Sequence, residues 1–202
     1  MISILWFKRD LRLDDHAALT AAAKRGPVLP LYIIEPDYWQ QPDTSLRHWQ
    51  FIKGALLELD KQLRSLGQPL LILRGPASKV LVQLCQQYQA TAVFSHEETG
   101  NLWSYQRDVA VAQALKAHGV AWFQFRQFAI FRPLLNRDHW FHQADEWLKS
   151  PLEKPPPALT PVFAAVVTPH AEPPASGVHL EQKLTELAPT RQHDLPPCHS
   201  MQ

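Results

Sequence analysis

The chain has 202 residues, enough for one α/β domain with an appended segment but not for two large domains. Its 20 basic and 19 acidic side chains leave a formal net charge of +1, which excludes a free-standing nucleic-acid binder held mainly by phosphate contacts. Two cysteines, Cys85 and Cys198, exclude a disulfide-built scaffold and favour the reducing cytoplasm. Apolar runs are too short to span a membrane, so we expect no membrane partner.

The prolines divide the chain into two parts. Eleven of the 18 prolines lie in residues 151–202, whereas all seven tryptophans come earlier. We therefore predict an α/β domain over residues 1–150 and a Pro-rich linker over 151–202, with few buried side chains apart from a short helix near 180–188. A Pro-rich segment either joins two bodies or forms a terminal tail, and composition leaves both open.

Within residues 1–150, short apolar runs alternate with amphipathic segments. The predicted strands are 2–7, 28–34, 70–73, 91–95 and 120–125, and the predicted helices are 17–24, 45–66, 77–88, 103–118 and 138–149. Asp14 or Asp15 is the expected N-cap of the first helix. Strand–helix alternation of this period predicts a Rossmann-like, doubly wound, five-stranded parallel sheet with helices on both faces.

Ligands of such sheets bind beyond the carboxyl ends of the strands, where the strand order reverses. The loops at that edge carry neither a Gly-rich dinucleotide fingerprint nor a P-loop, so we do not expect an ordinary NAD or ATP phosphate cradle. His96, Glu97 and Glu98 are better explained as a solvated loop than as metal ligands, because no second histidine stands at ligand spacing. We therefore predict no metal site.

The loop after the first strand carries the most specific motif. Residues 6–16 read Trp-Phe-Lys-Arg-Asp-Leu-Arg-Leu-Asp-Asp-His. This string resembles the N-terminal signature of the photolyase and cryptochrome family, in which a strand ending in Trp-Phe precedes two mostly basic residues, Asp-Leu-Arg-Leu, a spacer and Asp-His or Asp-Asn. Further segments resemble the family in the same order: 30–36, 47–51, 56–60, 71–75 and 105–108. The resemblance covers about residues 2–150.

The resemblance implies an α/β domain that holds a light-harvesting antenna chromophore and precedes a helical FAD domain. In the family, reduced FAD donates an electron to a pyrimidine dimer in flipped-out DNA. FAD and damaged DNA then belong to the helical domain and the full-length protein, a deoxyribodipyrimidine photo-lyase, which is a carbon–carbon lyase. On this reading the chain stops in the linker and is not catalytic by itself.

The resemblance also implies antenna contacts at the carboxyl edge of the sheet. They are Arg9, Asp10 and Arg12 in the first loop, Arg47 and His48 at the start of the long helix, and Glu98, Asn101 and Trp103 before the fourth helix. Folate-binding relatives carry an Asn-Glu pair where Trp103 and Ser104 stand here, so a flavin or deazaflavin is expected ahead of methenyltetrahydrofolate. We expect the three arginines and His48 to point into one cleft bounded by Trp103, where cations can hold a phosphate or ring carbonyl.

Two other readings stay open. The same domain occurs in cryptochrome blue-light photoreceptors, and the residues that separate the two classes lie in the FAD domain. Alternatively, the chain is a stand-alone nucleotide- or partner-binding α/β module that ends in a Pro-rich tail. The downstream reading frame discriminates these readings, because a photolyase or a cryptochrome requires a further helical domain of about 250–300 residues.

Overall fold

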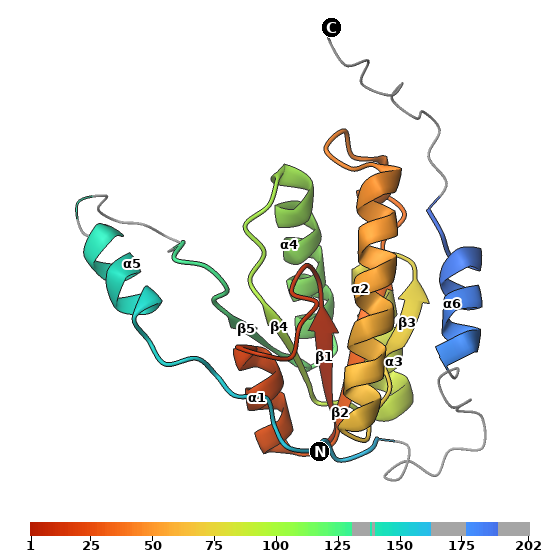
Figure 1. Cartoon of the computed structure of the whole chain (residues 1–202), viewed down its shortest axis with the longest axis horizontal. Helices are drawn as coiled ribbons and strands as arrows, with labels where there is room; N and C mark the ends of the chain where they lie inside the picture. Colours follow the sequence, from red (N-terminus) through yellow and green to blue (C-terminus); the bar gives the residue numbers. More distant parts are fainter. Residues whose placement is uncertain (131–137, 139, 163–176, 190–202) are drawn as a thin grey trace, which may run out of the picture.

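A computed structural model describes residues 1–130, 138, 140–162 and 177–189, and its sheet is the predicted one (Figure 1). Five parallel strands lie in the order β3-β2-β1-β4-β5, so the strand order reverses between β1 and β4. The strands are β1 (Ser3–Phe7), β2 (Val28–Ile34), β3 (Leu71–Arg74), β4 (Ala92–His96) and β5 (Ala121–Phe125). The predicted doubly wound α/β class is confirmed.

Helices cover both faces of the sheet. Helices α1 (Ala17–Arg25) and α2 (Leu46–Ser65) cover one face, and α3 (Ala77–Tyr88) and α4 (Leu102–Ala117) cover the other. The 3-10 turn η1 (Tyr38–Gln40) precedes α2, and α5 (Trp140–Leu148) and α6 (Gly177–Glu186) follow the sheet in the chain. None of these described helices combines the length and the apolar composition that a membrane crossing requires.

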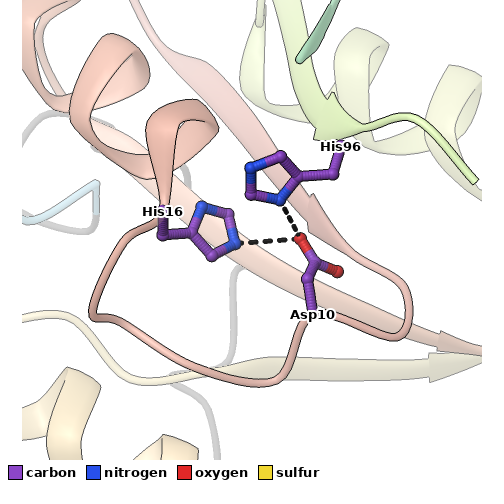
Figure 2. A group of neighbouring side chains, drawn as sticks. All are labelled: Asp10, His16 and His96. Atoms are coloured by element: carbon purple, nitrogen blue, oxygen red, sulfur yellow. Dashed lines mark hydrogen bonds and ion pairs between the residues drawn. The ribbon is translucent and has the colours of Figure 1, made fainter. Parts of the chain in front are cut away.

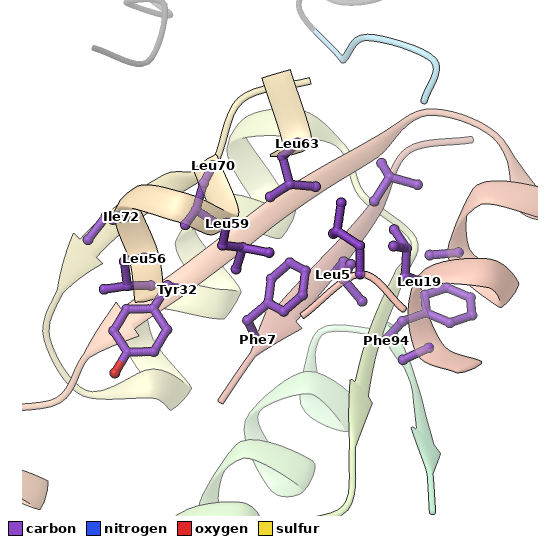
Figure 3. Packing of buried hydrophobic residues seen from close by; sticks show 14 of the residues in the cluster. Leu5, Phe7, Leu19, Tyr32, Leu56, Leu59, Leu63, Leu70, Ile72 and Phe94 are labelled. Atoms are coloured by element: carbon purple, nitrogen blue, oxygen red, sulfur yellow. The ribbon is translucent and has the colours of Figure 1, made fainter. Parts of the chain in front are cut away.

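Successive side chains along each strand point to opposite faces of the sheet, and this divides the core into two layers. Leu5 and Phe7 of β1 face α1 and α2, where Leu19 and Leu59 cover them (Figure 3). Ile4 and Trp6 of the same strand point to the other face, where they pack with residues of α3 and α4. All seven residues of β2 are buried, as its continuous apolar run predicts for a strand covered on both faces.

The cap of α1 differs from the prediction. His16, rather than Asp14 or Asp15, is the N-cap, and its Nδ1 accepts a hydrogen bond of 3.0 Å from the backbone N–H of Leu19. Asp15 takes a left-handed backbone conformation with φ of 49°, which turns the chain so that the following residue enters the cap position. A histidine therefore satisfies one of the orphan amides in the first turn of α1.

The segment after residue 150 packs on the α/β core more than predicted. The backbone N–H of Leu159 donates to the carbonyl of Leu66 at 2.7 Å, and that of Val162 donates to Gln68 Oε1 at 2.9 Å. Both apolar side chains are buried, whereas the other side chains at 151–162 are exposed or half-buried, so this segment adds two residues to the core that its Pro-rich composition did not predict. The expected short helix is present as α6.

Helix α6 lies beside α2 and adds buried leucines to the same layer of the core (Figure 1). Residues 163–176 and 190–202 of the predicted linker, including Cys198, lie outside the described residues. The boundary between domain and linker therefore stays a prediction.

We expect Leu184→Ala to lower the free energy of unfolding by about 2–4 kcal/mol, because Leu184 is fully buried on α6. Leu152→Ala is the matched control, since that side chain is 77% exposed, and it should change the free energy by less than about 0.5 kcal/mol. Urea unfolding of the 202-residue chain measures both. Equal losses would show that α6 contributes nothing to the core.

Candidate functional site

The guanidinium of Arg107 lies at the centre of the carboxyl edge of the sheet. Its Nη1 is 2.6 Å from Glu35 Oε2, its Nε is 2.8 Å from Asp108 Oδ1, and its Nη2 pairs with Glu98. Burial alone would lower the pKa of Arg107, but the three carboxylates together raise it above its ordinary value. The side chain therefore stays charged and joins the end of β2, the loop after β4 and α4.

Two further cations complete this ionic network. Lys8 Nζ lies 3.1 Å from Asp108, and Arg9 Nε lies 3.0 Å from Glu98. Burial lowers the pKa of Lys8, and the neighbouring Asp108 opposes that shift. With Arg107 and Glu35, three cations thus face three carboxylates, and the floor of the site carries no excess charge.

Aromatic rings hold the network from two sides. The Arg107 guanidinium lies 4.9 Å from the ring centroid of Trp6 and 5.5 Å from that of Trp103. Trp103 also packs against Tyr38, with centroids 5.6 Å apart. Arginine suits this position because its planar group stacks and pairs at the same time. Trp103 therefore packs against the ionic network and helps to hold Arg107 in place.

A cavity of about 520 Å³ opens between the first loop and α2, and we call it the α2-side cavity. Its lining includes polar, apolar and aromatic side chains: Lys8, Arg9, Leu11, Arg12, Tyr38, Asp43, His48, Phe51, Ile52 and Ala55. Arg12 is fixed there by hydrogen bonds to the carbonyls of Asp14, at 3.1 Å, and Asp15, at 3.0 Å.

The expected convergence of Arg9, Arg12, Arg47 and His48 on one cleft is only partly observed. Arg9, Arg12 and His48 line the α2-side cavity. Arg47 is exposed and is not among its lining residues, because adjacent positions on a helix point about 100° apart. Trp103 does not bound the cavity either, since it stacks on Tyr38 and Arg107. The shared-cleft prediction is therefore wrong for Arg47 and Trp103.

Two other predicted residues have structural partners. Asn101 is the N-cap of α4: its Oδ1 accepts from the Ser104 N–H at 3.1 Å, and its Nδ2 donates to Asp43 at 3.2 Å. Glu98 is shared between Arg9 and Arg107. Neither residue lines the α2-side cavity.

Asp10 forms a buried hub beneath the first loop (Figure 2). Its Oδ2 lies 2.9 Å from His16 Nε2 and 2.7 Å from His96 Nδ1, and its Oδ1 accepts from the Lys8 backbone N–H at 2.8 Å. Burial alone would raise the pKa of Asp10, but the two histidines hold it well below its ordinary value. Asp10 is 1% and His96 2% exposed, so the solvated loop expected at His96 is wrong.

The hub resembles a metal site in composition but not in its hydrogen bonds. One ligand atom from each of Asp10, His16 and His96 lies within 4.8 Å of the others. However, Nδ1 of His16 accepts from Leu19 N–H, so the proton of the neutral ring is on Nε2, which faces Asp10. A metal at Nε2 would require an imidazolate, whereas metal-bound histidines normally donate through their other nitrogen. The hub is therefore a structural contact, and its strength depends on the protonation state of His16.

The sequence analysis missed several residues of this edge. Lys8, Glu35 and Arg107 form the ionic network, and Tyr38 joins it to the α2-side cavity. The Arg-Asp pair at 107–108 was visible as part of the family resemblance. Its partners were not, because they lie up to 100 residues away in the sequence.

The hub predicts an acid-sensitive fold. Burial lowers the pKa of His16 below its ordinary 6.5, with Asp10 opposing, so the unfolded chain binds a proton that the folded chain does not. Stability should therefore rise with pH through the range below 6.5, with a slope of up to about 1.4 kcal/mol per pH unit for one proton. Protonation also removes the acceptor that caps α1.

Urea titrations between pH 5 and pH 7 measure this slope. His16→Asn keeps a capping side chain but loses the titrating ring, so its slope should be shallower. The control is His142→Asn, whose side chain is 80% exposed and should leave the slope unchanged. An unchanged slope in His16→Asn would contradict the assignment.

Comparison with known proteins gives one consistent family. A family model described as DNA photolyase matches residues 3–175. A deoxyribodipyrimidine photo-lyase of Synechococcus sp. is 34% identical over 118 residues, which are 58% of this chain and 24% of the relative. Cryptochrome-1 of Arabidopsis thaliana is 34% identical over 134 residues, which are 65% of this chain and 19% of the relative. The chain thus spans about a fifth to a quarter of the length of these relatives.

Solved structures show the same fold. A class III photolyase from Agrobacterium tumefaciens superposes with a TM-score of 0.69 at 26% identity, covering 93% of this chain and 38% of its own. A photolyase from Sulfolobus tokodaii, solved with two FAD molecules, gives a TM-score of 0.69 at 21% identity, over 95% of this chain and 42% of its own. Since the family model covers most of the sequence, this chain belongs to the DNA photolyase family.

Proposed function

We propose that the chain is the antenna-binding domain of a photolyase-type flavoprotein and that it holds a flavin or deazaflavin in the α2-side cavity. The observation that carries the proposal is the cavity itself. Its volume of about 520 Å³ lies within the range of small-molecule sites, about 300–1,000 Å³. Phe51, Ile52 and Leu11 supply apolar surface for a planar ring system.

The charges of the cavity support an anionic or carbonyl-bearing ligand. Arg9 is engaged by Glu98, but no carboxylate among the described residues pairs with Arg12 or His48. Arg12 is also held in place by two backbone carbonyls, so little side-chain entropy is lost when it binds. These two side chains can hold a phosphate or a ring carbonyl.

Folate in the pose that the resemblance implies is less well supported. The Asn-Glu pair of folate-binding relatives is replaced by Trp103 and Ser104. Trp103 stacks on Arg107, and the Ser104 hydroxyl donates to the carbonyl of Asn101 at 2.8 Å. Neither side chain offers the amide and carboxylate pair of that pattern.

The full-length protein then carries a helical FAD domain, reached through the linker after residue 150, and repairs pyrimidine dimers in DNA in the cytoplasm. Apolar side chains at the carboxyl edge support docking of such a domain. Leu46, Phe51, Leu102 and Tyr105 are between 41% and 78% exposed at the amino ends of α2 and α4. A cryptochrome is the second candidate, because Cryptochrome-1 matches this chain at the same identity as the photo-lyase.

Titration of FMN, a deazaflavin and a methenylfolate against the 202-residue chain tests the proposal. We expect weak flavin or deazaflavin binding, since a helical domain closes the edge in the family, and weaker folate binding. Arg12→Ala and His48→Ala should each reduce flavin affinity by about tenfold, as expected for a charge-assisted hydrogen bond.

Arg47→Ala is the matched control, since Arg47 is a cation next to His48 on α2 that does not line the cavity. It should leave the affinity unchanged. Flavin binding that is lost in Arg47→Ala, or that is unaffected by both other substitutions, would place the chromophore elsewhere.

A further inference from the structure

A second, smaller pocket lies where the strand order reverses, between the loops that follow β1 and β4. Its volume is about 140 Å³, and its lining includes His96, Glu97, Thr99 and Gln127. A cavity of about 150 Å³ holds one benzene ring. This pocket, which we call the β4-side pocket, therefore fits a single ring and is too small for a flavin.

His96 presents an unused acceptor at this pocket. Asp10 is ionised and accepts at 2.7 Å from Nδ1, which places the proton of the neutral ring on Nδ1 and a lone pair on Nε2. Nothing in the described part of the chain donates to Nε2, although His96 is only 2% exposed. The low exposure belongs to the ring as a whole: Nε2 is not among the buried side-chain atoms of the described residues that lack a partner, so it is open and can accept from a ligand that carries an N–H group.

Glu97 supplies a negative charge at the β4-side pocket. Its backbone N–H donates to the Phe125 carbonyl at 2.7 Å, which fixes the residue at the pocket, while its carboxylate has no ion-pair partner among the described residues. The cations that reach the pocket, Lys8 and Arg9, are already paired with Asp108 and Glu98. The extra carboxylate leaves the pocket with a negative bias, which favours a cation over an anion.

We propose that the β4-side pocket binds a single-ring amidine or amino-heterocycle, with its N–H groups donating to His96 Nε2 and to the Glu97 carboxylate. This ligand differs from the proposed antenna in size and in charge. The site is also distinct from the α2-side cavity, because His96, Glu97 and Gln127 do not line that cavity. An experiment on one proposed site therefore neither supports nor contradicts the other site.

Benzamidine is the probe, and NMR of the 202-residue chain with nitrogen-15-labelled histidine is the measurement. His96→Asn identifies the His96 resonances. We expect the free chain to show a pyridine-like Nε2 for His96, and benzamidine to move that resonance in a saturable way. Benzoate, which has the same ring and the opposite charge, should not.

Glu97→Gln should weaken benzamidine binding by about tenfold, because it replaces a charge-assisted hydrogen bond by a neutral one. Glu58→Gln, on the exposed face of α2, is the matched control and should leave the affinity unchanged. The proposal is overturned if benzoate binds as well as benzamidine, if the His96 Nε2 resonance does not move, or if it shows a protonated Nε2 at neutral pH. These outcomes come from the unmodified chain and hold even if Glu97→Gln does not fold.

Discussion

One guanidinium organises the carboxyl edge of the sheet. Arg107 reaches from α4 to carboxylates that follow β2 and β4, and it lies between the rings of Trp6 and Trp103. Because these groups are largely buried, removing one partner would leave an uncompensated charge, at a cost of about 3–5 kcal/mol. The segments after β2 and β4 are thus fixed relative to α4, although they are distant in the sequence.

The ionic network also determines which basic side chains at this edge are paired with a carboxylate and which are not. Lys8, Arg9 and Arg107 neutralise three carboxylates and contribute to the architecture of the edge. Arg12 and His48, on the α2 side, have no such partner among the described residues and line the larger cavity. Arg12 is thus a guanidinium of the larger cavity that has no carboxylate partner among the described residues.

Beneath the network, the Asp10 hub ties the first loop to the sheet and to α1. One carboxylate meets the cap residue His16 on one side and His96 at the end of β4 on the other (Figure 2). The same carboxylate fixes the tautomer of His96 and so determines what the β4-side pocket offers to a ligand. Structure and site chemistry are therefore coupled through Asp10.

The sequence predicted the sheet and its helices, because apolar periodicity depends only on neighbours in the chain. It did not predict the ionic pairing, since Arg107 and Glu35 lie 72 residues apart. The cap of α1 depends on a left-handed turn at Asp15, which no residue pattern indicated. Leu159 and Val162 were missed as core residues because they meet Leu66 and Gln68, which lie far from them in the sequence. The sequence alone therefore did not predict side-chain partners that are distant in the chain, nor the left-handed turn at Asp15.

Hydrogen exchange in an Arg107→Lys variant tests the central role of Arg107 most directly. Lysine keeps the charge but cannot contact three carboxylates and two rings with one planar group. We predict faster exchange of the backbone amides at 8–12 and 97–101, with the amides of β1 and β2 unchanged. Unchanged exchange in both loops would show that the edge is held in place without Arg107 and would contradict the account.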